Sequence, residues 1–190
     1  MARASNQPLF RPPAEAASLI LQAVCGCPHN GCAFCGMYKS LAFRRRPPPE
    51  LRQLVEAETR RNPGARRVFL GDGDVLHLPF GELRELLVSL NQRLPELARI
   101  NAYANGSSIL GYSAEELREL RRLKLHTLYL GLESGDQATL TRMTKADSVE
   151  QMIEAGLRAQ AAELKMSVMI LLGLGGRAHS REHAAATAAA

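Results

Sequence analysis

Residues 67–90 read RVFLGDGDVLHLPFGELRELLVSL, and this single segment contains a strand, a loop and a helix in succession. Residues 67–70 form a short apolar run, which predicts a buried strand that stops at Gly71-Asp72-Gly73-Asp74. The i, i+3, i+4, i+7 spacing that follows is typical of an amphipathic helix and is formed by Leu83, Leu86, Leu87 and Leu90. The segment therefore predicts one β/α unit with a glycine-rich loop at the carboxyl end of its strand.

The same alternation extends from this unit in both directions along the chain. Upstream, residues 19–24 predict a strand, residues 44–49 a proline-rich linker, and residues 50–61 a helix. Downstream, further strands are expected at 99–103, 126–130 and 166–172. Capping-box sequences at 113–116 and 148–151 predict two helix starts. The second of these helices is expected to turn Met152, Ile153, Gly156 and Leu157 inward, and Ser180 is expected to cap a later helix.

Five strands that alternate with helices predict an α/β protein with a parallel sheet, either a parallel barrel or an open doubly wound sheet. In both architectures the site lies at the carboxyl ends of the strands. The unusual residues of the sequence fall there. Cysteines follow the first strand, GDGD the second, residues 131–135 the fourth and residues 173–176 the fifth.

The overall composition is that of a globular protein. The chain has 190 residues, of which 46% are hydrophobic and 23% charged, and this argues against a disordered chain. No apolar run approaches the roughly 18 residues of a membrane span, and the start of the sequence lacks an apolar signal region. We therefore expect a cytoplasmic protein without a membrane partner. The net charge of +5 permits an anionic partner, so the arginines at 44–46 and 66–67 could contact RNA or form a solvated face.

All four cysteines lie within one short loop, at Cys25, Cys27, Cys32 and Cys35. Thiolates select zinc, copper(I) or iron–sulfur clusters, and structural zinc sites usually use two separated cysteine pairs. The C-x4-C-x2-C spacing of Cys27, Cys32 and Cys35 could instead hold three irons of a [4Fe–4S] cluster and leave the fourth iron open. Cys25 lies outside this spacing and is either a spectator or a substitute ligand.

The cysteine loop resembles that of the radical S-adenosylmethionine (SAM) superfamily. The superfamily usually has C-x3-C-x2-C with an aromatic residue before the last cysteine, and Phe34 matches that aromatic residue. The spacing here is one residue longer between the first two cysteines. Residues 26–39, GCPHNGCAFCGMYK, are most similar to the elongator-type and methylthiotransferase-type branch.

The resemblance implies a partial parallel (β/α) barrel, five of its six units being present, and two cofactors, a [4Fe–4S] cluster and SAM. It implies that Cys27, Cys32 and Cys35 are the metal ligands. It further implies a set of SAM contacts: the loop Gly71, Asp72, Gly73 and Asp74 for the amino group, Gly131, Glu133 and Ser134 for the ribose or methionyl end, Lys145 for the carboxylate, and Gly173 and Gly175 beside adenine. The plainer alternatives are a simple turn for GDGD, a helix start for Glu133 and a surface lysine for Lys145.

The function implied by the resemblance is reductive cleavage of SAM to methionine and a 5′-deoxyadenosyl radical, with an electron donor such as flavodoxin or ferredoxin and an unidentified substrate. Residues 1–18 are expected to form an irregular lead-in, and residues 19–190 a core that lacks its last unit and has an exposed sheet edge. Two alternatives stay open. One is a zinc-binding module with four cysteine ligands, and the other is a truncated core that is inert.

Overall fold

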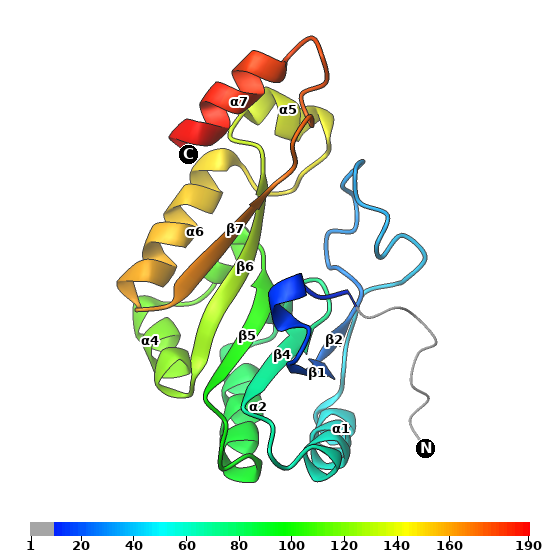
Figure 1. Cartoon of the computed structure of the whole chain (residues 1–190), viewed down its shortest axis with the longest axis vertical. Coiled ribbons are helices and arrows are strands. Elements are labelled where there is room, and N and C mark those ends of the chain that lie inside the picture. The colour runs from blue at the N-terminus through cyan, green and yellow to red at the C-terminus, as the bar shows by residue number, and fades with distance from the viewer. Residues whose placement is uncertain (1–9) are drawn as a thin grey trace.

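The computed structural model describes residues 10–190, and at its centre lies one sheet of five strands in the order β1-β4-β5-β6-β7 (Figure 1). The strands are β1 (Leu19–Gln22), β4 (Arg67–Gly71), β5 (Arg99–Ala104), β6 (Leu125–Glu133) and β7 (Lys165–Ile170). Each pairs in parallel with the next. The spatial order follows the chain order without the reversal that defines a doubly wound sheet. The predicted α/β class is confirmed, and the sheet is part of a parallel (β/α) barrel.

Helices connect successive strands, as the alternation predicts. The longer ones are α1 (Pro48–Arg61), α2 (Phe80–Arg93), α4 (Ala114–Arg122), α6 (Val149–Ala161) and, after β7, α7 (Ser180–Ala189). Shorter turns of helix are η2 (Val75–His77), α3 (Gly106–Leu110) and α5 (Gln137–Arg142). Both predicted capping boxes are confirmed, because the Ser113 and Ser148 hydroxyls accept the backbone N–H of Glu116 and Gln151.

Strand β4 is buried on both faces, which explains why it reads as a continuous apolar run. Val68 and Leu70 of β4 point into the core formed with the helices. Phe69, between them, points to the opposite face, where its ring meets Tyr103 at 5.1 Å and Tyr129 at 6.0 Å in edge-on contacts. The inner face of the partial barrel is therefore aromatic.

The N-terminal lead-in adds a polar group to this inner face. A short 3-10 helix, η1 (Pro13–Glu15), places Glu15 where it accepts hydrogen bonds from Asn101 Nδ2 at 2.7 Å and from Tyr129 Oη at 2.6 Å. Burial acts to raise the pKa of Glu15, but these bonds and one from Ser18 hold the pKa below its ordinary value. The lead-in is thus anchored across two strands of the sheet.

The first predicted strand is two strands in the structure. After β1, the chain turns at Ala23 and forms β2 (Val24–Cys25), which pairs in antiparallel fashion with β3 (Arg44–Arg45). The prediction of a linker at 44–49 is wrong. Residues 44–45 form β3, and α1 begins at Pro48, because proline has no N–H to lose at the first turn of a helix.

Helix α6 is rotated relative to the prediction. Met152 is buried as expected, but Ile153 is 36% exposed and Leu157 62% exposed, so their predicted inward orientation is wrong. The buried face of α6 instead includes Ala155 and Ala159. These small side chains let α6 pack closely on α3 and on the sheet, where larger residues would be overpacked.

The carboxyl ends of the last two strands also differ from the prediction. Strand β6 continues past Gly131 to Glu133, so Glu133 ends a strand rather than starting a helix. At the edge of the sheet, Val168 and Ile170 of β7 are about half exposed. Ser180 is the first residue of α7 and does not cap it. No helix of the described residues is long and apolar enough to cross a membrane.

Candidate functional site

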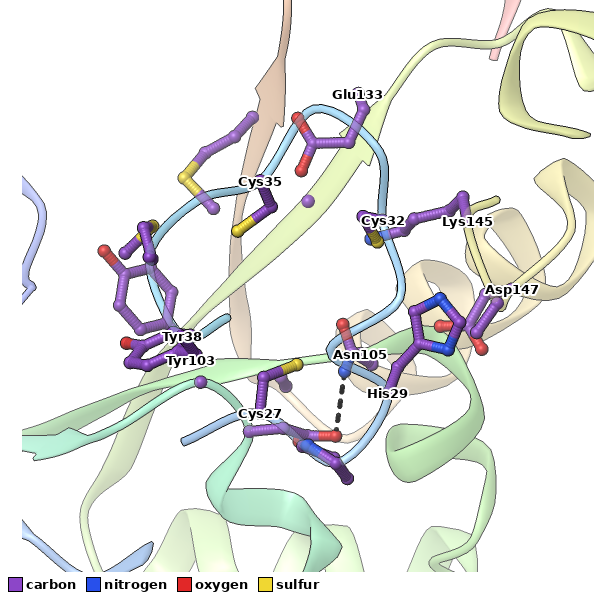
Figure 2. A pocket seen from close by; sticks show the side chains of 18 of the residues that line it. Cys27, His29, Cys32, Cys35, Tyr38, Tyr103, Asn105, Glu133, Lys145 and Asp147 are labelled. Carbon is purple, nitrogen blue, oxygen red and sulfur yellow. Dashed lines mark hydrogen bonds between the residues drawn. The ribbon is translucent and has the colours of Figure 1, made fainter. Parts of the chain in front are cut away.

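Three of the four cysteines lie on one loop between β2 and β3. Figure 2 shows the side chains of Cys27, Cys32 and Cys35 pointing from this loop toward a common space. A turn in which the Cys35 N–H donates to the Cys32 carbonyl at 3.2 Å sets the spacing of the last two. All three thiols are free and partly exposed. The predicted ligand set is therefore brought together on one side of a cavity.

The loop is held in place by the segment between α5 and α6. The His29 ring lies 2.6 Å from the Thr144 carbonyl through Nε2, and the Thr144 hydroxyl donates to the Gly31 carbonyl at 2.7 Å. The Ala33 N–H donates to the Met143 carbonyl at 2.9 Å. His29 is thus a loop residue held at the Thr144 carbonyl. These bonds join the cysteine loop to the chain that carries Lys145.

The cysteine loop and the strand ends enclose a cavity of about 610 Å³. Its wall includes nine of the predicted site residues: Cys27, Cys32, Phe34, Cys35, Gly73, Asp74, Gly131, Glu133 and Lys145. Apolar residues at the end of β7, Met169, Ile170 and Leu171, complete one side. The cysteine loop, the loop after β4 and the carboxyl ends of β6 and β7 therefore converge on one space, but residues 173–176, predicted to join them, are not part of the wall.

Glu133 and Lys145 place opposite charges beside Cys32. Burial raises the pKa of the Glu133 carboxyl, and the nearby Lys145 ammonium opposes this effect. Burial also raises the pKa of the Cys32 thiol, and Lys145 again opposes it. A side chain at Gly131 would place its Cβ 2.3 Å from Glu133 Oε1, so glycine leaves the room that this carboxylate occupies.

Asp74 is a buried acid at the floor of the cavity. Its Oδ2 accepts hydrogen bonds from Ser108 Oγ at 2.5 Å and Asn105 Nδ2 at 3.1 Å, the latter drawn in Figure 2. Among the described residues, its Oδ1 is buried without a hydrogen-bond partner. Burial raises the pKa of Asp74 to about 6, despite these bonds, and the charge of Asp147 adds to the shift.

The sequence interpretation missed Asn105, Ser108 and Asp147, which also line the cavity. Asn105 directly follows β5, the third strand of the sheet. The rule that sites lie at the carboxyl ends of parallel strands, applied to this strand as to the other four, would have found it. Asp147 precedes the Ser148 capping box, and its contact with the cavity has no local sequence signal.

Five predicted SAM contacts do not belong to the cavity wall: Gly71, Asp72, Ser134, Gly173 and Gly175. The Ser134 hydroxyl is buried 2.8 Å from Nδ1 of His183 on α7, and Gly175 packs against the same helix. The Asp72 carboxylate is buried and turned toward Gln22 and the cysteine loop. The structure leaves the predicted SAM contacts of these five residues untested.

Cys25 is separated from the other cysteines. It lies in β2, paired with Arg44, and is not part of the cavity wall. A four-thiolate zinc site needs all four sulfurs around one ion. Within residues 10–190, no group of three or more His, Cys, Asp or Glu side chains is close enough to hold a single metal ion. A cubane cluster distributes its cysteine ligands over separate iron atoms, so it does not require the three thiols to meet at one ion.

The fold and the site together define a parallel (β/α)-barrel protein with a three-cysteine loop at the carboxyl ends of its strands. The family model for the radical SAM superfamily matches residues 21–188, and the chain belongs to that family. The family uses a [4Fe–4S] cluster and SAM. No curated protein matches the sequence.

Solved structures share this fold at low sequence identity. The cobalamin-dependent S-adenosylmethionine radical enzyme OxsB, with aqua-cobalamin and SAM bound, superimposes with a TM-score of 0.62 and 17% identity over 82% of this chain and 24% of that one. Methylornithine synthase (PylB) gives 0.63 and 18% over 87% and 48%. The hydrogenase maturase HydG from Carboxydothermus hydrogenoformans gives 0.60 and 21% over 90% and 39%. The chain spans less than half the length of each.

The residues present fit the family's cofactors. Three soft thiolates from one loop are the donor set of an iron–sulfur cluster. The unpartnered Oδ1 of Asp74 can accept a hydrogen bond from a cationic group. A Cβ at Gly73 would lie 2.9 Å from the Cβ of Cys27. Only glycine at this position therefore lets the loop after β4 pack this closely against Cys27.

Proposed function

We propose that this chain is the catalytic core of a radical SAM enzyme, in which Cys27, Cys32 and Cys35 hold a [4Fe–4S] cluster. The observation that carries the proposal is the convergence of these three thiols on a cavity whose other walls are the carboxyl ends of parallel strands. When bound, the reduced cluster supplies one electron that cleaves SAM to methionine and a 5′-deoxyadenosyl radical.

The cavity-lining residues divide the recognition of SAM among them. Lys145 provides a cation for the methionyl carboxylate, and Asp74 an acceptor for the methionyl ammonium through its buried Oδ1. Glu133, at the end of β6, accepts hydrogen bonds from the hydroxyl groups of the ribose. Gly73 allows the backbone to approach the ligand closely. SAM contacts of the remaining five residues stay predictions, because none of the five lines the cavity: Gly71, Asp72, Ser134, Gly173 and Gly175.

The apolar part of the cavity keeps water away from the reacting atoms. Phe34 precedes the last cysteine, and Met169 and Leu171 lie on the wall formed by the end of β7. Excluding water prevents side reactions of a reactive intermediate. The sequence of residues 26–39 supports an assignment to the elongator-type and methylthiotransferase-type branch.

The proposed partners follow from the chemistry. A one-electron carrier such as flavodoxin or ferredoxin supplies the electron, and SAM is the small-molecule ligand. The four free cysteines suit a reducing compartment, which supports a cytoplasmic location.

Anaerobic reconstitution with iron and sulfide, followed by reduction and addition of SAM, tests the proposal. The wild-type chain is expected to bind iron and sulfide and to form 5′-deoxyadenosine. Cys32→Ala should lose both properties. Cys25→Ala is the matched control, because Cys25 lies outside the cavity, and it should keep both.

The results separate the proposal from its alternatives. One zinc per chain without iron would support the four-cysteine zinc module instead. Loss of the cluster in Cys25→Ala would make Cys25 a ligand and contradict the three-ligand assignment. A cluster that forms but leaves SAM intact would identify this chain as a binding core that is inert.

A further inference from the structure

A chain of polar contacts, outside the cavity and more deeply buried toward its end, connects the start of helix α1 to the cysteine loop. Its members are Glu50, Arg46, Gln22 and Asp72, and it ends at the backbone of Gly26. Gln22 ends β1 and Asp72 follows β4, two strands that are paired in register at Gln22 and Gly71. The topology therefore brings these side chains to the same edge of the sheet.

Asp72 is the acceptor at the end of this chain. Its Oδ2 accepts hydrogen bonds from Gln22 Nε2 at 2.7 Å and from the Gly26 N–H at 3.2 Å. The residue is only 2% exposed. Both donors are N–H groups and both reach Oδ2, so this oxygen acts as an acceptor only.

Arg46 fixes the orientation of the Gln22 amide. The Arg46 Nη2 donates to Gln22 Oε1 at 2.9 Å, and its Nε donates to the Gln22 carbonyl at 2.5 Å. The guanidinium is almost fully buried and is paired with Glu50 at the first turn of α1. Because Arg46 occupies the amide oxygen, the amide nitrogen of Gln22 must point to Asp72.

Gly26 immediately precedes the first cysteine of the predicted ligand set. Its N–H is held by the Asp72 carboxylate, and its carbonyl accepts the Gly73 N–H at 3.1 Å. Both backbone groups of Gly26 are therefore fixed by consecutive residues of the loop after β4. Cys27 follows directly and has little freedom to move relative to that loop.

We propose that Asp72, oriented by Gln22 and Arg46, is a positioning residue that fixes Cys27 and places a buried negative charge beside the cluster. The inference rests on the proposed function, since it concerns the cluster that Cys27 would bind. It assigns Asp72 to the loop and not to SAM, because its carboxylate faces Gly26 and lies outside the cavity wall. Net charge and surroundings set the potential of an iron–sulfur cluster.

Two substitutions separate the anchor from the charge. Asp72→Leu removes the acceptor and leaves the buried Gly26 N–H and the partly buried Gln22 amide unpaired, and we expect roughly tenfold faster loss of iron to a chelator. Asp72→Asn keeps an oxygen that can accept both hydrogen bonds but removes the charge. We expect it to retain iron like the wild type and to show a more positive midpoint potential. Glu56→Gln makes the same carboxylate-to-amide change on the exposed face of α1 and is the control.

The measurements are the rate of iron loss to a chelator, the electron paramagnetic resonance (EPR) spectrum and the midpoint potential of the reconstituted chain. Wild-type iron retention in a folded Asp72→Leu variant overturns the anchoring role. An unchanged midpoint potential in Asp72→Asn overturns the charge role. If Asp72→Leu does not fold, the potential of Asp72→Asn alone decides the proposal. If the wild-type chain binds no cluster, the proposed function itself is contradicted. If wild type and variants bind the cluster equally and have the same potential, only the role of Asp72 is contradicted.

Discussion

Gly73 packs tightly against the cysteine loop, and this makes Gly73→Ala a sharp perturbation. A Cβ at this position would lie 2.9 Å from Cys27 Cβ, 3.1 Å from the Gly26 carbonyl oxygen and 3.2 Å from Cys27 Cα. Two of these three are backbone atoms. They cannot turn aside as a flexible side chain would, so the whole loop must move.

The size of the effect follows from these distances. Carbon atoms pack favourably at about 3.5–4.0 Å, so the new methyl group overlaps Cys27 by roughly 0.5 Å or more. Overpacking of this kind costs about 1–3 kcal/mol. For a chain of this length each kcal/mol lowers the melting temperature by about 2–4 °C. We therefore expect Gly73→Ala to lower the melting temperature by about 2–12 °C.

Circular dichroism melts and iron analysis after anaerobic reconstitution measure the two consequences, lower stability and a displaced Cys27. Gly81→Ala is the control, because a Cβ there meets nothing within 4 Å and alanine favours the helix. A Gly73→Ala variant with the wild-type melting temperature and full iron content would refute the close packing of these two loops.

Three further predictions concern buried or capping polar groups. In the folded protein the pKa of Asp74 is raised to about 6, so the protonated carboxyl stabilises the fold at low pH and this stabilisation is lost as the pH rises toward 6. Asp74→Asn should remove this part of the pH dependence of the unfolding free energy. Ser134→Ala should lower the free energy of unfolding in urea by about 1–3 kcal/mol, because it leaves the buried His183 Nδ1 with only a longer contact to Thr187 and removes the acceptor of the Asp136 N–H. Asp136→Asn should weaken the loss of stability in acid, because the hydrogen bonds from Thr139 lower the pKa of Asp136; that stabilisation is present above the unfolded pKa and disappears as pH falls through the folded one.

Each of these has a result that contradicts it. The Asp74→Asn prediction is contradicted if the unfolding free energies of variant and wild type change in parallel between pH 4 and 7, a range that contains the pKa of about 6. For Ser134→Ala, it is an unfolding free energy equal to that of the exposed control Ser40→Ala. For Asp136→Asn, it is an acid transition that coincides with the wild-type transition.

The hydrophobic pattern was sufficient to predict the sheet and most helices. Strands buried on both faces leave a continuous apolar signal, and the Ser113 and Ser148 capping boxes leave a local one. The pattern failed where tertiary packing decides. Ile153 and Leu157 have the helical spacing of a core, yet α6 turns its alanines inward to approach α3.

The site was predictable where residues lie at the end of a strand or just after it. Cys27, Gly73 and Glu133 all line the cavity as expected. The orientation of individual side chains was not predictable from spacing. Asp72 and Asp74 are two residues apart in one loop, yet one carboxylate faces Gly26 and the other lines the cavity, since hydrogen-bond donors from distant parts of the chain orient each.

The central claim is that three cysteines hold a cluster that binds SAM. The EPR spectrum of the reconstituted and reduced chain, recorded before and after addition of SAM, tests it most directly. We predict a [4Fe–4S] signal that requires Cys27, Cys32 and Cys35, persists in Cys25→Ala and changes when SAM is added. A chain without that signal, or a signal that SAM does not alter, would contradict the account.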